Sequence, residues 1–419
     1  MRAGRWAVAV VCGCVAALPC AGEKHGKSTG PAGPHWVATW AAAMQGPEPT
    51  QVQMTEAQLT DVTVRQIVHL TLGGPVLRVQ LSNAFGTQPL RVDAVHVAKA
   101  KAPGQSAIDA ATDHAVMFGG KEAVLIPAGA VYLSDPVALP MEAAGDLAIS
   151  LHYAEPPSVT TTHVASHATT FLVHGVHTAD AELVEPEKVL HWVGLAEVDV
   201  TAPAEAGAVV AFGDSITDGT ASTTDANNRW PNVLAARLLA DKKLRGLAVV
   251  NEGIGGNHLL TDRVGEAALK RFDRDVLAIS GVRYLVVLEG INDLGALSRR
   301  GEATADERAE LVGRMEGALQ QVIDRAHAHG IAVIGCTITA DGGAKSYHPT
   351  AEDDAARAAV NAWILTPGHF DGTVDLDKVT RDPADATKLQ AGFDSGDHLH
   401  PGPAGYKAMG EAIPLELFR

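Results

Sequence analysis

The chain carries two patterns of hydrophobic and polar positions, one in each half. Between residues 36 and 200, apolar residues occupy every second position of short segments such as 62–70, 76–81 and 90–97, and glycine-rich turns such as 73–75 separate these segments. Strict alternation over short segments is typical of strands with one buried face, and frequent turns favour antiparallel pairing. The first half therefore predicts an antiparallel, β-rich domain of the sandwich or jelly-roll type.

The second half shows short, continuous apolar runs that alternate with segments of helical period. Such runs predict strands that are buried on both faces, and helices between them indicate a parallel sheet covered on both sides. The best-marked helix precedes the fourth strand, because Thr304 and Glu307 form a capping box and Gly330 ends the apolar stripe. The predicted strands are 208–212, 247–251, 284–289, 331–336 and 373–376.

The two patterns meet in the segment 202–207, which contains alanine, proline and glycine. We therefore predict a β-rich N-terminal domain over residues 36–204 and an α/β domain over residues 205–419. The length of 419 residues agrees with two domains, because it exceeds what one hydrophobic core usually organises.

The first 22 residues resemble a leader rather than part of a fold. Arg2 and Arg5 precede an apolar run at 6–18, and small residues follow it, which is typical of a secretory signal peptide. The run is too short to span a bilayer comfortably, so we expect a secreted or periplasmic protein with no membrane insertion after cleavage. Lipid attachment at Cys20 is the alternative, although Pro19 before it fits poorly. Residues 23–35 are predicted to form a flexible linker.

Charge and cysteine content narrow the possible partners. The chain has 33 basic and 49 acidic residues, a formal net charge of −16. This balance argues against nucleic acid or anionic membranes as partners. Cys12, Cys14 and Cys20 fall in the leader, so the mature chain keeps only Cys336, which lies in an apolar run and is expected to be a buried, unreactive thiol.

Polar residues of catalytic type follow three of the predicted strands. Asp214 and Ser215 come directly after the first strand, and active sites of open α/β sheets lie at this edge. The glycine-rich loop 251–257 follows the second strand, and its backbone N–H groups could face an oxyanion; its spacing matches neither a phosphate-binding loop nor a dinucleotide fingerprint. Asn292 follows the third strand and could offer a side-chain amide, although asparagine there is also a common helix cap.

Two residues near the C-terminus complete a candidate catalytic set. Asp397 and His400 are three positions apart, so within one helical turn the carboxylate could hold the imidazole in one tautomer. The other ring nitrogen would then be free to accept a proton from a serine. Asp/His clusters also bind metals, but a closed site needs further ligands nearby, and we expect neither a metal nor another cofactor.

These stretches, in this order, resemble the SGNH (GDSL-type) acyl-hydrolases. The matching blocks are Gly213-Asp214-Ser215, Asn251 through Gly256, Gly290-Ile291-Asn292-Asp293 and Asp397-His398-Leu399-His400-Pro401. The resemblance implies a flavodoxin-like, three-layer α/β/α domain in which Ser215 is the nucleophile, His400 the general base and Asp397 its orienting carboxylate. It also implies an oxyanion hole formed by the N–H groups of Ser215 and Gly256 and the amide of Asn292; a shift of one residue would replace Gly256 by Gly255.

Further segments are similar to a bacterial subgroup related to esterases of xylan-degrading systems. They include Arg229-Trp230-Pro231 and Arg271 through Asp275, and the subgroup commonly has a β-rich segment before the hydrolase domain. The resemblance implies a serine esterase that acts on short-chain, chiefly acetyl, esters of carbohydrates, with a small ester or an acetylated glycan as substrate. The alternatives are a lipase, lysophospholipase or arylesterase of the same family, and a non-catalytic glycan-binding protein.

The remaining candidates have a functional and a structural interpretation. Asp214, Asn257, Arg229 and Trp230 could line the substrate pocket, but Trp230 could equally belong to the buried face of a helix. Five histidines of the β-rich half could bind a metal, yet their spacing matches no standard ligand set, and hydrogen-bonded or surface histidines are favoured. They are His163, His167, His174, His177 and His191.

Overall fold

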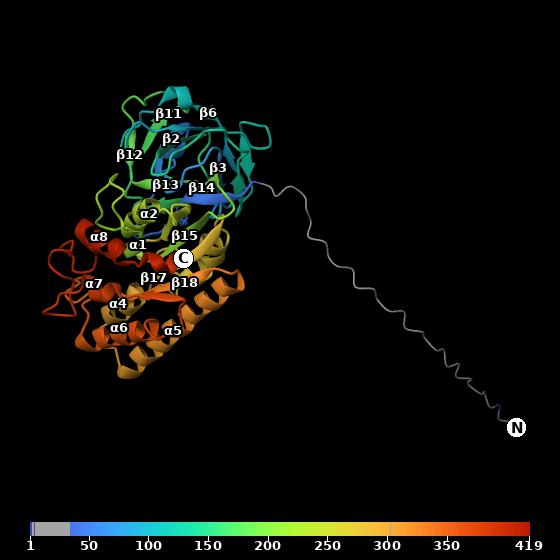
Figure 1. Cartoon of the computed structure of the whole chain (residues 1–419). Coiled ribbons are helices and arrows are strands. Elements are labelled where there is room, and N and C mark those ends of the chain that lie inside the picture. Colours follow the sequence, from blue (N-terminus) through green and yellow to red (C-terminus); the bar gives the residue numbers. More distant parts are fainter. Residues whose placement is uncertain (2–3, 5–33, 302) are drawn as a thin grey trace. The chain divides into compact units, whose positions relative to one another are not determined.

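Antiparallel strands fill residues 36–201, and a parallel sheet with helices follows from residue 207 (Figure 1). The computed structural model describes residues 1, 4, 34–301 and 303–419. The predicted signal peptide at 1–22, with Cys20, and most of the predicted linker at 23–35 lie outside the described residues. Among the helices of the described part of the chain, none is long and apolar enough to cross a membrane.

The first half contains two larger antiparallel sheets and two small ones. One sheet has the order β1-β14-β3-β8 and the other β12-β11-β2-β9-β5-β6, while β4 pairs with β7 and β10 with β13. The prediction of antiparallel strands is thus confirmed. The strands are β1 (Trp36–Ala41), β2 (Val62–His69), β3 (Leu77–Ser82), β4 (Leu90–Val92), β5 (Ala94–Lys99), β6 (His114–Ala115), β7 (Val124–Ile126), β8 (Val131–Leu133), β9 (Asp146–Tyr153), β10 (Thr162–Val164), β11 (Thr170–His174), β12 (Glu187–Val189), β13 (His191–Val193) and β14 (Leu195–Thr201).

Strand β2 departs from the alternation, because its polar residues are buried as well. Arg65 is completely buried, and its guanidinium donates hydrogen bonds to Ser150 Oγ at 2.8 Å, Ser106 O at 2.7 Å and Thr178 O at 3.1 Å. Loops that contain Ser106 and Thr178 thus cover this face of the sheet. The hydrophobic pattern alone could not show this cover, since it comes from segments far away in the chain.

The second half is built on five parallel strands in the order β16-β15-β17-β18-β19. They are β15 (Gly207–Gly213), β16 (Leu247–Gly253), β17 (Val282–Leu288), β18 (Ala332–Cys336) and β19 (Gly372–Val374), within two residues of the predicted runs at nearly every end. The chain runs outward from β15 to β16 and then returns to β17 on the other side of β15. The strand order therefore reverses at β15, and ligands of open α/β sheets bind at such a reversal, beyond the carboxyl ends of the strands.

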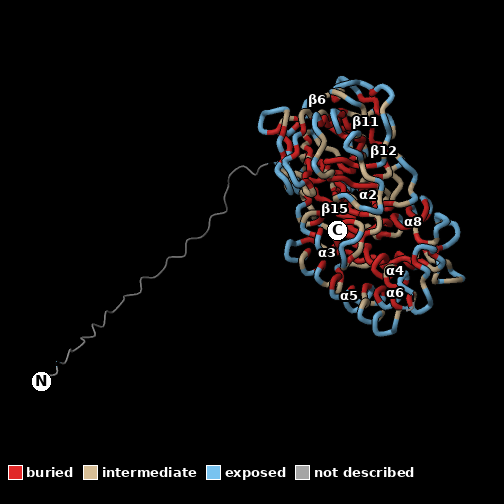
Figure 2. The backbone as a smooth tube through the Cα atoms, turned by 180° about the vertical axis from the view of Figure 1, so that it is seen from behind, coloured by how far each residue is buried: buried red, intermediate tan, exposed pale blue. Residues whose placement is uncertain are grey.

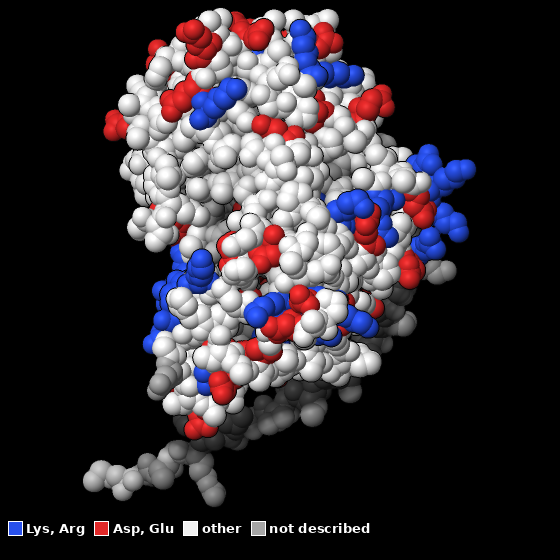
Figure 3. Space-filling model, turned by 90° about the vertical axis from the view of Figure 1, so that its left-hand side faces the viewer, with Lys and Arg blue, Asp and Glu red and all other residues white. Residues whose placement is uncertain are grey.

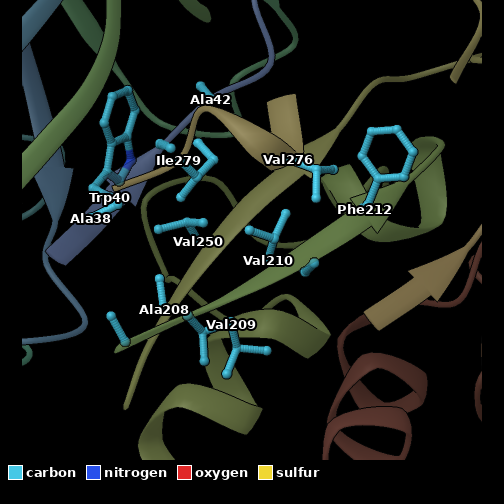
Figure 4. Packing of buried hydrophobic residues seen from close by; sticks show 14 of the residues in the cluster. Ala38, Trp40, Ala42, Ala208, Val209, Val210, Phe212, Val250, Val276 and Ile279 are labelled. Carbon is cyan, nitrogen blue, oxygen red and sulfur yellow. The ribbon is translucent and has the colours of Figure 1, made fainter. Parts of the chain in front are cut away.

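Helices cover the sheet and connect its strands. They are α1 (Ser215–Asp218), α2 (Trp230–Ala240), α3 (Ala268–Phe272), α4 (Ile291–Arg299), α5 (Ala305–Ala328), α6 (Ala351–Ile364), α7 (Leu376–Thr380) and α8 (Pro403–Ala412), with the π-helical turn η3 (Asp273–Leu277) and short 3-10 turns η1 (Ala57–Leu59), η2 (Ala110–Thr112) and η4 (Leu415–Phe418). Helix α5 begins with the predicted capping box of Thr304 and Glu307. In Figure 4, Val210 and Phe212 point toward Val276 of η3, whereas Val209 points to the opposite side of the sheet.

The β-rich and α/β halves share an extensive contact, and residues Pro34–Arg419 form one compact unit. Strand β1 packs along β16, and Ala42 forms a parallel bridge with Asn251. Thr71 Oγ1 donates to Val249 O and accepts from Val249 N–H, each at 3.0 Å. Figure 2 shows buried backbone running from one half into the other. Cys336 on β18 is buried, which raises the pKa of its thiol to about 12, as expected for an unreactive cysteine.

Candidate active site

Ser215 lies just beyond the carboxyl end of β15, as the first residue of α1. Asp214 caps this short helix, because its side chain accepts a hydrogen bond from Ile216 N–H at 2.9 Å. The turn before it requires glycine, since a Cβ at Gly213 would stand 2.2 Å from the carbonyl oxygen of Leu288. The sequence thus places the Ser215 hydroxyl at the edge of the sheet where the strand order reverses.

A chain of hydrogen bonds joins Ser215, His400 and Asp397. The distance from Ser215 Oγ to His400 Nε2 is 2.8 Å, and His400 Nδ1 lies 2.6 Å from Asp397 Oδ2. An ionised carboxylate can only accept, so Nδ1 carries a proton and Nε2 of a neutral imidazole accepts from the serine hydroxyl. The structure therefore brings the three predicted residues together, although 185 positions separate Ser215 from His400.

Asp397 and His400 stand in a loop rather than in a helix. Asp397 Oδ1 accepts hydrogen bonds from the N–H groups of Leu399 at 2.9 Å and His400 at 2.8 Å, and these bonds fold the loop around the carboxylate. Partial burial alone would raise the pKa of Asp397, but the hydrogen bonds from the His400 side chain and the two N–H groups outweigh it and hold the pKa well below its usual range. The Asp397 carboxylate is thus charged and accepts the hydrogen bond from His400 Nδ1.

Three backbone N–H groups beside the serine are free to bind an oxyanion. Within the described part of the chain, no hydrogen bond uses the N–H of Ser215, Gly255 or Gly256. Gly256 has a φ of 78°, and a Cβ there would stand 3.0 Å from a methyl group of Val264, so the loop requires glycine at this position. Both glycine N–H groups are therefore available as hydrogen-bond donors.

The amide of Asn292 is held in one orientation at the start of α4. Its Nδ2 donates to the carbonyl oxygen of Asn257 at 2.6 Å, and its Oδ1 accepts from the hydroxyl of Tyr347. One N–H of the amide stays available for a further acceptor. Tyr347 lies in the segment between β18 and α6 and carries no motif, so the sequence interpretation missed it. Its ring packs on Gly295, where a Cβ would stand 2.4 Å from the ring.

Three of the four residues predicted to line a pocket are interior instead. Trp230 is fully buried beside Leu234 and Leu238 on the inner face of α2, which is the structural alternative considered above. Asn257 is fully buried as well and donates to the carbonyl oxygens of Val264 and Glu266. Asp214 is 1% exposed and serves as the cap of α1. Arg229 lines a cavity, which it shares with Asp218 and His163.

Arg271 ties together the strand ends beneath the site. Its guanidinium is fully buried and donates to Gly213 O at 2.9 Å, Glu252 O at 2.8 Å and Asn257 Oδ1 at 2.9 Å. It also forms an ion pair with Asp275 at 3.0 Å. One side chain thus connects the ends of β15 and β16 with the glycine-rich loop 251–257. This loop carries the candidate oxyanion donors and is called the oxyanion loop below. The sequence interpretation used Arg271 only as part of a family resemblance and did not foresee this role.

Buried carboxyl groups follow the carboxyl ends of β15 and β17. Burial raises the pKa of Asp214 to about 7 and that of Asp293 to about 6. Burial together with the nearby Asp214 also raises the pKa of Glu289 well above its usual range, and neither carboxyl oxygen of Glu289 makes a hydrogen bond within the described residues. These groups therefore hold protons at pH values where exposed carboxyls have lost them.

The described residues contain no group of three or more histidine, cysteine, aspartate and glutamate side chains placed to hold a metal ion. His398, in the same loop as Asp397 and His400, pairs with Asp394 at 2.6 Å. Four of the five histidines in the β-rich half bond to protein groups, as the sequence favoured: His163 to Ala43 O and Asp218, His174 to Thr60 O, His177 to Asp180, and His191 to Val52 O. His167 Nε2 is buried without a partner among the described residues.

Comparison with known proteins shows which family and which solved structures the chain is similar to. Residues 211–408 match the model of the GDSL-like lipase/acylhydrolase family. A search of curated proteins found no match. Among solved structures, the chain is similar to a GDSL-like lipase from Bacteroides thetaiotaomicron, with 19% identity, a TM-score of 0.36 and coverage of 50% of this chain and 87% of that one. It is also similar to an acetyl xylan esterase from Geobacillus stearothermophilus, with 20% identity, a TM-score of 0.35 and coverage of 51% and 95%.

Proposed function

Because the chain carries a domain of the GDSL-like lipase/acylhydrolase family and is a carboxylic ester hydrolase, we propose that it cleaves short-chain esters through Ser215, His400 and Asp397. The observation that carries this proposal is the hydrogen-bonded chain from Ser215 Oγ through the imidazole to the Asp397 carboxylate. We also propose that the domain has the flavodoxin-like, three-layer fold, and the strand order β16-β15-β17-β18-β19 supports this proposal.

The reaction proceeds in two displacements. His400 Nε2 takes the proton of Ser215 while Oγ attacks the ester carbonyl, and the Asp397 carboxylate stabilises the imidazolium that forms. The N–H groups of Ser215 and Gly256 and the amide of Asn292 hold the oxyanion. The C–O bond to the alcohol then breaks, and the alcohol leaves with the proton from His400. Water repeats the sequence on the acyl-serine and releases the carboxylic acid.

Acetylated carbohydrates are the proposed substrates, and the exterior of the cell or the periplasm the proposed location. The first proposal rests on the similarity of the Arg229-Trp230-Pro231 and Arg271–Asp275 segments to esterases of xylan-degrading systems, and the second on the leader at 1–22. On the face drawn in Figure 3, acidic and basic side chains lie interspersed with uncharged surface.

The proposal is tested with Ser215→Ala. This variant is expected to keep the native unfolding midpoint and to lose hydrolysis of 4-nitrophenyl acetate, because its turn is otherwise unchanged. The wild type, and not the variant, should be labelled by a serine-directed phosphonate. Retention of near wild-type turnover by the variant would disprove the mechanism.

Substrate class is tested separately, by measuring acetate release from acetylated polysaccharides beside the hydrolysis of short and long acyl chromogenic esters. Preference for long acyl chains would favour a lipase or lysophospholipase instead. Absence of any hydrolysis, together with binding of glycans, would favour a non-catalytic glycan-binding protein.

A further inference from the structure

A buried hydrogen bond connects the β-rich half to the turn that carries Ser215. His163 on β10 places its Nε2 3.1 Å from Oδ1 of Asp218, the last residue of α1. The two side chains are 4% and 2% exposed. The pair therefore lies in the interior, and nothing in the mechanism described above uses it.

Each nitrogen of the His163 ring has a hydrogen-bond partner. His163 Nδ1 lies 2.8 Å from the carbonyl oxygen of Ala43, which can only accept, and Nε2 faces a carboxylate, which also only accepts when ionised. The His163 ring is therefore held between a backbone carbonyl on one side and the Asp218 side chain on the other. Burial alone would raise the pKa of Asp218, but the contact with His163, together with the nearby His167 and Arg229 side chains, holds it below its usual value.

Asp218 contacts both parts of the catalytic machinery. Its backbone N–H donates to Asp214 O at 2.9 Å and closes the turn that begins at Ser215. A Cβ at Gly253 would stand 2.2 Å from Asp218 N, and a Cβ at Gly255 would stand 3.6 Å from Asp218 Oδ2. The carboxylate thus lies between the serine turn and the glycine loop that supplies the oxyanion donors.

The same part of the β-rich half also holds the loop 219–229, which follows the serine turn. Thr169 donates to the Asp225 carboxylate through its N–H and its hydroxyl, each at 2.6 Å. Asp225 N–H in turn donates to His167 O at 3.0 Å. Three residues of this loop other than glycine have positive φ: Ala221, Asp225 and Asn227. Such conformations cost free energy and persist where neighbouring contacts impose them.

We propose that His163 is a positioning residue of the esterase, and that the β-rich half sets the geometry of Ser215 and the oxyanion loop through its contact with Asp218. The β-rich half is then a structural part of the active site and not a separable glycan-binding module. This inference rests on the function proposed above, because it assigns a role within the same reaction.

The test is His163→Gln, which keeps approximate size and hydrogen-bonding capacity but replaces the imidazole that contacts Asp218 and Ala43 O at the same time. Turnover of 4-nitrophenyl acetate is expected to fall about 10- to 100-fold, because small misplacements of reacting groups are costly, while KM stays within about twofold. Inactivation by a serine-directed phosphonate should slow by a similar factor, since it reports the same nucleophile and oxyanion geometry. The matched control is His96→Gln, which breaks the His96–Asp113 pair, 2.9 Å long, within the β-rich half. It should leave kcat and the phosphonate rate unchanged.

Two further variants separate the possible outcomes. Asp218→Asn keeps the size of the side chain and removes its charge, so it should reproduce the loss of kcat, and it decides the question if His163→Gln does not fold. The double variant should lose no more than the worse single variant, because the two residues act as one pair. A folded His163→Gln or Asp218→Asn protein with wild-type kcat and phosphonate rate would overturn the inference. If Ser215→Ala stays active, the proposed function fails instead, whatever His163 does.

Discussion

The hydroxyl of Tyr347 donates a hydrogen bond to Oδ1 of Asn292, and this contact determines which end of the amide faces the oxyanion loop. With Oδ1 engaged, Nδ2 must point toward Asn257, where it donates to the backbone carbonyl at 2.6 Å. Burial raises the pKa of Tyr347 well above its usual value, so the phenol keeps its proton and remains a donor. An aromatic residue without a motif thus orients a proposed catalytic amide.

Tyr347→Phe is expected to lower kcat about tenfold, which corresponds to about 1.4 kcal/mol of transition-state stabilisation, with little change in KM. The amide loses the partner that fixes its orientation but keeps its N–H groups. Steady-state kinetics with 4-nitrophenyl acetate measure the effect. The exposed Tyr132 of β8 provides the control, since Tyr132→Phe removes a hydroxyl away from the site. An unchanged kcat in Tyr347→Phe would show that Asn292 needs no such support.

Asn292→Ala is expected to lower kcat on the order of 10²–10³-fold, because it deletes one oxyanion donor. The loss should exceed that of Tyr347→Phe, which only releases the donor. The two effects should not add in the double variant, since Tyr347 acts through Asn292. Equal losses in the two single variants would place the role of Tyr347 elsewhere.

Asp397→Asn should reduce kcat by about 10⁴-fold, because an amide facing His400 Nδ1 permits the wrong imidazole tautomer. The neighbouring pair of Asp394 and His398 offers a matched control in the same loop. Asp394→Asn removes a carboxylate that bonds His398 and not His400, so it should retain most of the activity. Single-turnover kinetics and the unfolding midpoint of both variants check this expectation. Similar losses in both would mean that the loop conformation matters and not the carboxylate at 397.

Arg271→Gln is expected to lower the free energy of unfolding by about 3–5 kcal/mol, since it breaks a buried ion pair with Asp275 and leaves buried acceptors at the ends of β15 and β16 without their donor. Urea unfolding followed by circular dichroism measures the change. Arg283→Gln is the control, because the exposed Arg283 guanidinium donates only to Glu205 O within the described residues. A loss below about 1 kcal/mol, the scale of a surface pair, would contradict a central role for Arg271.

Asp214 should make the folded protein less stable as the pH rises. Its pKa of about 7 in the folded state exceeds the unfolded value of about 3.9, so the folded state binds the extra proton. The free energy of unfolding therefore falls as the pH rises from about 4 to about 7, by at most about 1.4 kcal/mol per pH unit from this group. Asp214→Asn keeps the acceptor for Ile216 N–H and should lose this part of the slope. Urea titrations at several pH values compare the two proteins, and parallel curves would refute the expectation.

The sequence predicted the parts of the fold and site that have local signals. The residues 208–212 and 247–250 are all apolar, so they marked β15 and β16 without knowledge of their neighbours. Ser215, Asp397 and His400 lie in short motifs whose order along the chain carried the resemblance. The five strands and the meeting of these three side chains follow from that information.

The remaining contacts join segments that have no relation in sequence. Tyr347 lies 55 positions from Asn292, and His163 lies 55 positions from Asp218, so neither pair leaves a local pattern. Trp230 shows the opposite problem: a tryptophan next to a catalytic motif suggests a pocket wall, but only the packed structure shows that it fills the core. Polar contacts between distant segments depend on tertiary packing, so they can be identified only from the structure.

Strand β16 is the outermost strand of the parallel sheet, yet its free side never meets solvent. Strand β1 lies along it, and the Thr71 hydroxyl satisfies both peptide groups of Val249. A fragment trimmed to residues 205–419 would uncover this row of N–H and C=O groups beside a hydrophobic strand, which is a template for pairing with another molecule. Such a fragment would therefore self-associate and precipitate. The β-rich half keeps the protein in solution by covering this edge, and a truncation that removes it would also remove this protection.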